Sequence, residues 1–366
     1  QTALERFRDR WDWWNLSENP GLPWTEELIA RYADQWDWAR LSKNQALSWS
    51  DELIARYTER WNWSNLSANA ALPWTEELLE RYENRWSWLW DGLSKNEALP
   101  WTEHLINYYE SRWSWGELSR NESIPWNDSL IAIHAEKWSW QNLGGNRSLP
   151  WSQELIARYE NNFFQKREKK GGFFSAPTIE IKASISGNEK IPWSEGLIAK
   201  YQESWEWYKL SMIVRWTPSM LARFASKINF SWLSSNGKVA WTPAIIERFS
   251  EKLSWSYLSA NETLPWSDKL IETHANRLAW DLLSSNQAMP WSENLIDKYL
   301  SQSRWSWKYL IANESIPWTE TLAEKYSQYW DWKTLSTNKT FPWTENLIAR
   351  HADQWDWAAL SRTRGL

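Results

Sequence analysis

The segment "LPWTEELIARYADQWDWARLSKN", residues 22–44, decides the fold because close copies of it follow one another along the chain. Each copy contains a Pro-Trp step, a Trp-x-Trp step and a Leu-Ser-x-Asn step, where x is any residue. The tryptophan of the Pro-Trp step, or of its remnant, anchors each copy, and most anchors are 25 residues apart. These anchors are Trp24, Trp49, Trp74, Trp101, Trp126, Trp151, Trp193, Trp216, Trp241, Trp266, Trp291, Trp318 and Trp343. A period of this length is typical of tandem repeat proteins, in which each unit buries its apolar face against its neighbours.

Each copy predicts two short helices. Thr25 is a good N-cap for a first helix, whose apolar residues up to Trp36 follow the spacing of one helical face. Asp37 is again an N-cap type and predicts a second, shorter helix that carries Trp38. Asn44 ends the copy, and we expect it to stop the second helix in the left-handed conformation that asparagine tolerates. Its counterparts are Asn69, Asn96, Asn121, Asn146, Asn261, Asn286, Asn313 and Asn338.

The high tryptophan content supports this interpretation. The chain of 366 residues carries 38 tryptophans, and one tryptophan buries on the order of 150–250 Å². Helices this short do not persist alone in water. We therefore interpret Trp36, Trp38 and the anchor tryptophans as core residues that compensate for the short helices. The predicted fold class is all-α, an α-solenoid or superhelix of about 13 short two-helix repeats.

The repeat is interrupted near the middle of the chain. After Tyr159 the text reads "NNFFQKREKKGGFFSAPTIEIKASISGN", and the next anchor comes 42 residues after the previous one instead of 25. Alternation in "TIEIKASI" and the Gly171-Gly172 pair favour a small β-hairpin in this insert. We expect an N-terminal repeat arm over residues 1–160, an irregular junction over 161–217 that includes a degenerate repeat, and a C-terminal repeat arm over 218–366.

The insert is also the most distinctive candidate for a binding site. It combines a cluster of four basic residues with two pairs of phenylalanines in a protein whose net charge is −5. A solvated loop is the simpler interpretation, and a docking element for an acidic partner surface is the sharper one. The candidate partner-binding residues are Phe163, Phe164, Lys166, Arg167, Lys169, Lys170, Phe173 and Phe174.

Composition excludes several kinds of chemistry. The chain has no cysteine, so disulfides, thiolate nucleophiles and cysteine-ligated metal centres are excluded. No stretch approaches the roughly 18 to 20 apolar residues of a membrane helix. Glycine-rich phosphate loops and nucleophile elbows are missing. We therefore expect no cofactor, no metal, no catalytic residue and no membrane span.

The remaining titratable residues follow the repeat. Three of the four histidines, His134, His274 and His351, occupy the position of Tyr32, which indicates a packing role. His104 lies near a helix start and has no second histidine one turn away to make a metal pair. Carboxylate pairs such as Glu26-Glu27, Asp51-Glu52 and Glu76-Glu77 recur at first-helix starts, which favours dipole complementarity over catalysis. A glycosidase that uses two carboxylates in a tryptophan-lined cleft remains an alternative with little support.

The repeated text itself resembles a known kind of protein. With "WDWARLSKN" and "LPWTEELIARY" in view, the chain resembles uncharacterised bacterial proteins built from tandem tryptophan-rich units of the form Trp-x-Trp-x-x-Leu-Ser-x-Asn-x-x-Leu-Pro-Trp. The resemblance covers nearly all of residues 11–362, except the insert and the degenerate unit around Trp216. It favours a bacterial or phage-associated origin and implies no activity for this chain.

These patterns favour a non-enzymatic scaffold or adaptor, or a component of a multi-protein assembly. We expect protein partners to contact variable surface positions such as Ala33-Asp34, Thr58-Glu59, Glu83-Asn84 and Glu136-Lys137, together with the insert. The alternative is a carbohydrate-binding or carbohydrate-processing protein with exposed indoles. Single-stranded nucleic acid bound through the basic insert is a third and weaker alternative, because the net charge is negative. The expected location is cytoplasmic, although the absence of an initiator methionine leaves a processed or secreted chain open.

Overall fold

The computed structural model describes residues 3–89, 92–169, 178–183, 185–300, 302 and 304–362. Within these residues the chain is built from 27 α-helices, three short 3-10 helices and two strands. Almost every helix spans four to eight residues. The helical repeat fold expected from the sequence is therefore what the structure contains.

The chain divides into two compact units, Gln1–Trp205 and Glu206–Leu366. The division falls between the two tryptophans of a Trp-x-Trp step, in the repeat whose text "LSMIVRW" lacks the usual asparagine. It lies inside the segment 161–217 that the sequence marks as irregular.

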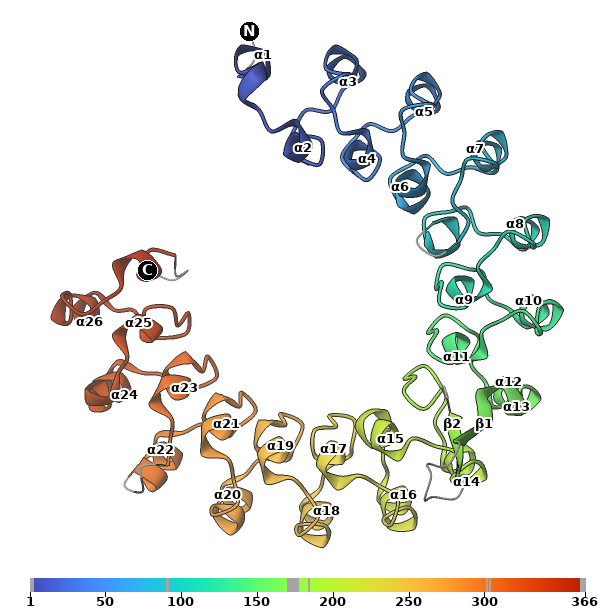
Figure 1. The fold of residues 1–366 in the computed structure, drawn as a ribbon. Helices are drawn as coiled ribbons and strands as arrows, with labels where there is room; N and C mark the ends of the chain where they lie inside the picture. Colours follow the sequence, from blue (N-terminus) through green and yellow to red (C-terminus); the bar gives the residue numbers. More distant parts are fainter. Residues whose placement is uncertain are drawn as a thin grey trace, which may run out of the picture. The chain divides into compact units, whose positions relative to one another are not determined.

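The first helices of the repeats line one side of each unit, as Figure 1 shows. Most follow an extended Pro-Trp step, or its remnant at Trp49, Trp216 and Trp241, and a Thr, Ser or Asn N-cap. Thr25 Oγ1, for example, accepts the Leu28 N–H at 3.2 Å. Those of the first unit are α1 (Ala3–Arg6), α3 (Glu26–Arg31), α5 (Asp51–Arg56), α7 (Glu76–Arg81), α8 (Glu103–Tyr108), α10 (Asp128–Ile133), α12 (Gln153–Arg158) and α14 (Glu195–Lys200). Those of the second unit are α16 (Pro218–Arg223), α18 (Pro243–Arg248), α20 (Asp268–His274), α22 (Glu293–Leu300), α24 (Glu320–Lys325) and α26 (Glu345–Arg350).

The second helices line the opposite side of each unit. In the first unit they are α2 (Trp13–Leu16), α4 (Trp38–Leu41), α6 (Trp63–Ala68), the 3-10 helix η2 (Leu93–Lys95), α9 (Trp115–Leu118) and α11 (Trp140–Leu143). In the second unit they are α15 (Trp207–Ile213), α17 (Phe230–Ser234), α19 (Trp255–Ala260), α21 (Trp280–Ser285), α23 (Trp307–Ala312), α25 (Trp332–Leu335) and α27 (Trp357–Leu360). Two further 3-10 helices, η1 (Arg8–Arg10) and η3 (Ser327–Tyr329), precede Trp-x-Trp steps.

The N-cap prediction for the second helices holds in some repeats only. Asp37 and Asn62 accept backbone N–H groups three residues later. Ser114 and Ser139 stand at the same position and make no side-chain cap. Ser254 at the same position does accept the Tyr257 N–H, at 3.5 Å, whereas Asp331 makes no side-chain cap, so the residue type alone does not decide whether the cap forms.

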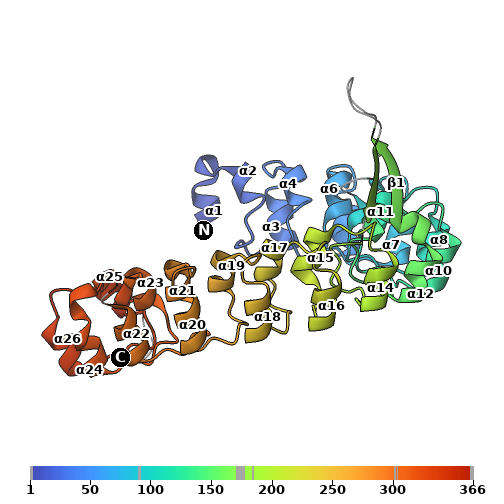
Figure 2. The ribbon, with the colours of Figure 1, turned by 90° about the horizontal axis from the view of Figure 1, so that it is seen from below.

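The irregular segment begins with α13 (Glu160–Phe163) and continues into β1 (Phe164–Lys169), which pairs antiparallel with β2 (Thr178–Ala183). Phe164 pairs with Ala183 at one end of the ladder and Lys169 with Thr178 at the other. Figure 2 shows the two strands projecting from the helices of the first unit. The strands stand where other repeats have their second helix.

Candidate binding surfaces

Contacts between successive repeats use most of the tryptophan side chains. Trp38 of one repeat packs against Tyr57 and Trp61 of the next, with ring centroids 4.8 Å apart in both pairs. Within that next repeat the anchor Trp49 packs on Trp61 at 5.0 Å. The same three contacts recur from repeat to repeat, for example at Trp63. Aromatic pairs of this kind contribute about 0.5–1.5 kcal/mol each beyond the area that they bury.

Indole N–H groups are also used inside the repeats. Trp36 Nε1 donates to the Ile29 carbonyl, Trp38 Nε1 to the Ala33 carbonyl and Trp49 Nε1 to the Asn44 carbonyl, at 2.9–3.2 Å. Most of the described tryptophans are buried or half-buried, and only Trp11, Trp14, Trp232 and Trp357 are more than a third exposed. Trp24, Trp36, Trp38 and the other anchor tryptophans are all buried or half-buried.

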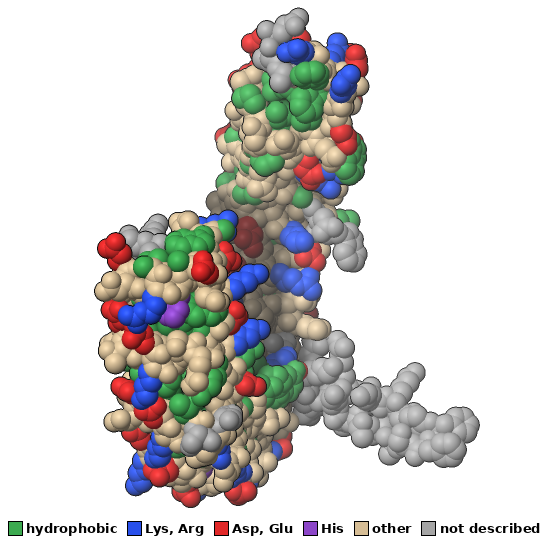
Figure 3. All heavy atoms as spheres, turned by 90° about the vertical axis from the view of Figure 1, so that its left-hand side faces the viewer, with side chains coloured by type: hydrophobic (Ala, Val, Ile, Leu, Met, Phe, Trp, Pro, Cys, Tyr) green, Lys and Arg blue, Asp and Glu red, His purple; other side chains and the backbone are tan. Residues whose placement is uncertain are grey.

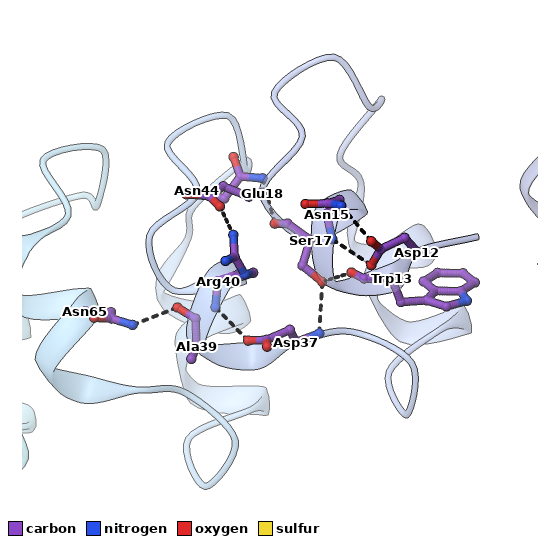
Figure 4. A network of polar contacts seen from close by, with 10 residues as sticks. All are labelled: Asp12, Trp13, Asn15, Ser17, Glu18, Asp37, Ala39, Arg40, Asn44 and Asn65. Carbon is purple, nitrogen blue, oxygen red and sulfur yellow. Dashed lines mark hydrogen bonds and ion pairs between the residues drawn. The ribbon is translucent and has the colours of Figure 1, made fainter. Parts of the chain in front are cut away.

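The Leu-Ser-x-Asn step links each repeat to the next by hydrogen bonds (Figure 4). Ser17 Oγ–H donates to the Trp13 carbonyl at 2.7 Å, and the same oxygen accepts the Asp37 N–H of the next repeat at 2.9 Å. Asn44 Nδ2 donates back to the Ser17 carbonyl at 3.1 Å. We call these aromatic and polar contacts together the repeat seam.

The asparagine of this step does not act as the sequence suggested. Asn69, at the C-cap of α6, has φ −82° and ψ 113°, which is extended rather than left-handed backbone. Its side chain is buried, donates to Ser42 and Asn44 carbonyls of the preceding repeat, and accepts the Ala71 N–H. The prediction of a left-handed helix stop was wrong, because the amide needs an extended backbone to reach across the seam. Equivalent cross-repeat bonds come from Asn96, Asn121, Asn146, Asn188, Asn236, Asn261, Asn286, Asn313 and Asn338.

The seam continues beneath the insert. Phe163 is fully buried and packs on Trp140 and Trp151, as the first tryptophan of a Trp-x-Trp step does elsewhere. Phe164 stacks on Tyr201 at 4.4 Å and contacts Trp205, as the second tryptophan does. After the strands, Asn188 Nδ2 donates to the Gly144 and Asn146 carbonyls.

This placement corrects part of the predicted partner-binding set. Phe163 and Phe164 pack in the seam, so their side chains hold the repeats together, and buried Phe163 has no surface to offer a partner. The sequence signal was the Tyr159-to-Phe163 spacing, which equals the Tyr32-to-Trp36 spacing. Lys166, Arg167 and Lys169 belong to β1. Lys170, Phe173 and Phe174 lie outside the described residues.

The histidines at the Tyr32 position pack as expected. His134 and His274 are buried, and their rings pack on Trp115 and Trp255 of the preceding repeats at 4.8 and 4.3 Å. Burial lowers the pKa of both imidazoles. His134 keeps this lowered pKa although Glu110 Oε1 lies 3.1 Å from its Nδ1, because desolvation outweighs the attraction of that carboxylate. Burial also lowers the pKa of His351, which contacts Trp332.

No catalytic or metal site is evident in the described part of the chain. No group of three or more His, Asp or Glu side chains there is placed to hold a metal ion. The first-turn carboxylates serve the helix ends, and the pKa of Glu77 is lowered by its own backbone N–H and by Thr75. Within the same residues every helix is too short or too polar to span a bilayer. Charged side chains of both signs are interspersed with apolar patches on the face shown in Figure 3.

One exposed apolar surface is specific to the second unit. Trp232, Tyr257, Leu282 and Tyr309 occupy the same position on the successive second helices α17, α19, α21 and α23, and each side chain is more than a third exposed. The rings of Trp232 and Tyr257 are stacked at 5.9 Å. We call these four residues the apolar row.

In the first unit the same position is polar at the described residues Asn15, Arg40, Asn65, Glu117 and Asn142. Asn65 and Asn142 there donate to backbone carbonyls of the preceding repeat, at 2.8 and 2.9 Å. The apolar row was not identified from the sequence, although aligning the repeats on Trp-x-Trp exposes it. Comparisons with protein-family models, with curated proteins and with solved structures found no match to this chain.

Proposed function

We propose that the protein is a non-enzymatic scaffold or adaptor whose repeats stack as an α-solenoid and bind protein partners through side chains that the seam does not use. The observation that carries this proposal is the apolar row. Seam residues are nearly the same in every repeat, whereas this surface position is polar at the described residues of the first unit and apolar on four successive helices, α17, α19, α21 and α23, of the second. An exposed apolar series on a repeat protein is an interaction surface by default, because such contiguous patches are rare on surfaces without a binding role.

The protein belongs, on this proposal, to a bacterial family of tryptophan-rich repeat proteins and works in the cytoplasm. The β1–β2 insert is proposed as a second contact element, a hairpin whose basic residues face an acidic partner. We assign the partner contact of the insert to residues 165–184 alone, because Phe163 and Phe164 are seam residues.

A tagged pull-down from the source organism with quantitative mass spectrometry tests the proposal. We compare the parent chain with W232S/Y257S, with T334A as a matched variant at the same position of α25, and with a chain in which residues 165–184 are replaced by a short Gly-Ser linker. The proposal predicts a protein that the parent and T334A retain and that W232S/Y257S loses. Capture of the same proteins at the same level by all four chains would contradict it.

Carbohydrate binding is the second candidate, and the stacked, exposed pair Trp232 and Tyr257 is the observation that favours it. Sugars stack on aromatic faces, and a row of such rings is one way to bind an extended chain. A glycan array that reports binding by the parent and none by W232S/Y257S would replace the scaffold proposal with this one.

A further inference from the structure

A ladder of ion pairs connects the first helices of successive repeats. Its cation is the residue directly before the Tyr32-type residue, which we call the cation position. Arg56 pairs with Glu26 of the preceding repeat, and Arg81 pairs with Asp51, at 3.2 Å in both cases. In the second unit Lys298 pairs with Glu272 at 3.1 Å. The carboxylates of this ladder stand two or six residues after the anchor tryptophan.

Helices α22 and α24 show the ladder site with both carboxylates present. Lys325 Nζ, at the cation position of α24, lies 2.6 Å from Glu293 Oε1 and 2.6 Å from Asp297 Oδ2 of α22. The hydrogen bonds that Lys325 donates to these two carboxylates raise the pKa of Lys325 and lower the pKa of Asp297. Two carboxylates one helical turn apart therefore form a site for an ammonium group.

Helix α7 carries the same two carboxylates without the cation. Glu76 and Glu80 stand at the positions of Glu293 and Asp297, but the cation position of α8 is Tyr108. Among the described residues no Lys or Arg pairs with Glu76 or Glu80, and Glu76 instead accepts the Thr102 hydroxyl at 3.2 Å. A pocket of about 150 Å³ lies here, lined by Glu76, Glu80, His104, Leu105, Tyr108 and Tyr109.

The next step of the ladder has lost its cation as well. Ile133 takes the cation position of α10, and the carboxylate of Glu103 that would face a cation accepts the Asn127 side-chain amide at 2.6 Å. Tyr108 and Ile133 are each 60% exposed, more than any other large apolar side chain in the described residues. Two successive ladder steps thus combine exposed apolar side chains with carboxylates that have no cation.

We propose that the face formed by α7, α8 and α10 binds a basic segment of a partner protein, whose Lys or Arg side chain enters the pocket between Glu76 and Glu80. The equivalent site on α22 is occupied by Lys325 of the same chain, which shows that two carboxylates in this arrangement bind an ammonium group. The ring of Tyr108 offers a cation–π face to the same side chain. Apolar residues beside the basic residue then cover Tyr108 and Ile133. This inference rests on the proposed function, since it names one class of partner for the repeat surface.

The test measures binding of a fluorescein-labelled peptide that alternates lysine with leucine, by fluorescence anisotropy with the full chain. We expect the parent to bind it and to lose affinity as salt is added, because salt screens exposed charges. The same peptide with every lysine acetylated should not bind, since acetylation removes the charge and keeps the length. E76Q/E80Q should weaken binding by roughly tenfold or more, the effect of losing charge-assisted hydrogen bonds.

A second variant tests the site while keeping both of its carboxylates. Y108K places a lysine at the cation position of α8, where it fills the site as Lys325 fills its own, and binding of the peptide should be lost. E293Q/D297N is the matched control, because that site is already occupied, and its affinity should equal that of the parent. Far-UV circular dichroism checks that each variant is folded.

Three results would overturn the inference. They are equal binding of the charged and acetylated peptides, undiminished binding by Y108K, and binding of lysine amide as tight as that of the peptide, which would indicate a site for small cations only. A second copy of this chain is excluded as occupant if the parent stays monomeric in sedimentation at the concentrations used. If the peptide experiments fail while the pull-down still retains a partner through the apolar row, the proposed function stands without this inference. The two failures are therefore distinguishable.

Discussion

Substituting Asn69 by alanine is the sharpest test of the repeat seam. This side chain is buried, and its amide donates to the Ser42 carbonyl at 3.0 Å and to the Asn44 carbonyl at 3.3 Å. Its Oδ1 accepts the Ala71 N–H at 2.9 Å. Alanine removes the bonds across the seam and the local one together.

The expected cost follows from these contacts. A hydrogen bond contributes about 1 kcal/mol net, and a buried group left without a partner costs about 1–3 kcal/mol. Losing the shared donor and leaving the Ala71 N–H without an acceptor should together destabilise the seam by about 3 kcal/mol. Asn19 offers a matched control, because it stands at the same position of the repeat but is exposed, and within the described residues its side chain makes only the hydrogen bond from Gly21 N–H to Oδ1.

Hydrogen exchange with mass spectrometry is the suitable assay, since repeat arrays need not unfold in one step. N69A should accelerate amide exchange in α4 and α6, the helices on the two sides of its seam. N19A should lower the free energy of local opening by less than about 1 kcal/mol. Equal effects of the two substitutions would refute the reasoning, because they would mean that the cross-repeat bonds contribute nothing.

Other predictions follow from the same contacts. W61A should lower the unfolding free energy by about 3–5 kcal/mol, whereas W61F should cost less because Phe163 already fills the equivalent position, and urea titration of both measures the difference. Stability should fall as the pH drops below about 6.5, since burial lowers the folded-state pKa of His134 and the unfolded chain then binds more protons. H134Y should flatten that slope between pH 7.5 and 5, and substitution of exposed His104 should not. Replacing residues 165–184 by a short Gly-Ser linker should shift the melting temperature by no more than about 3 °C, because the seam continues on both sides of the insert, and a larger loss measured by calorimetry would give the strands a structural role.

Much of the fold could be predicted from the sequence because the same structural unit occurs many times in the chain, so the positions that its fold requires stand out. A period of 25 residues, N-cap types at fixed places and a tryptophan at each turn specify two short helices and their core. Asn44 shows where that reasoning stops. A helix stop and a cross-repeat donor use the same residue type, and only the extended backbone and the distance to Ser17 separate them.

The binding surfaces were harder to predict for a physical reason. Seam residues repeat, so their pattern is visible, whereas a binding residue is an exception within the pattern. Tyr108 and Ile133 are such exceptions, and their meaning depends on Glu76 and Glu103, which lie 32 and 30 residues earlier in the sequence. The composition of the insert drew attention to its basic residues. Composition does not show that the neighbouring phenylalanines, Phe163 and Phe164, pack in the seam.

The central claim is that the tryptophans of the Pro-Trp and Trp-x-Trp steps hold the repeats together and leave binding to other side chains. Hydroxyl-radical footprinting read by mass spectrometry measures the solvent access of each indole in one experiment. The account predicts fast oxidation of Trp14 and Trp357, which are about half exposed, and slow oxidation of Trp24, Trp61 and the other buried tryptophans. Oxidation of the buried tryptophans at the rate of the exposed ones would contradict it.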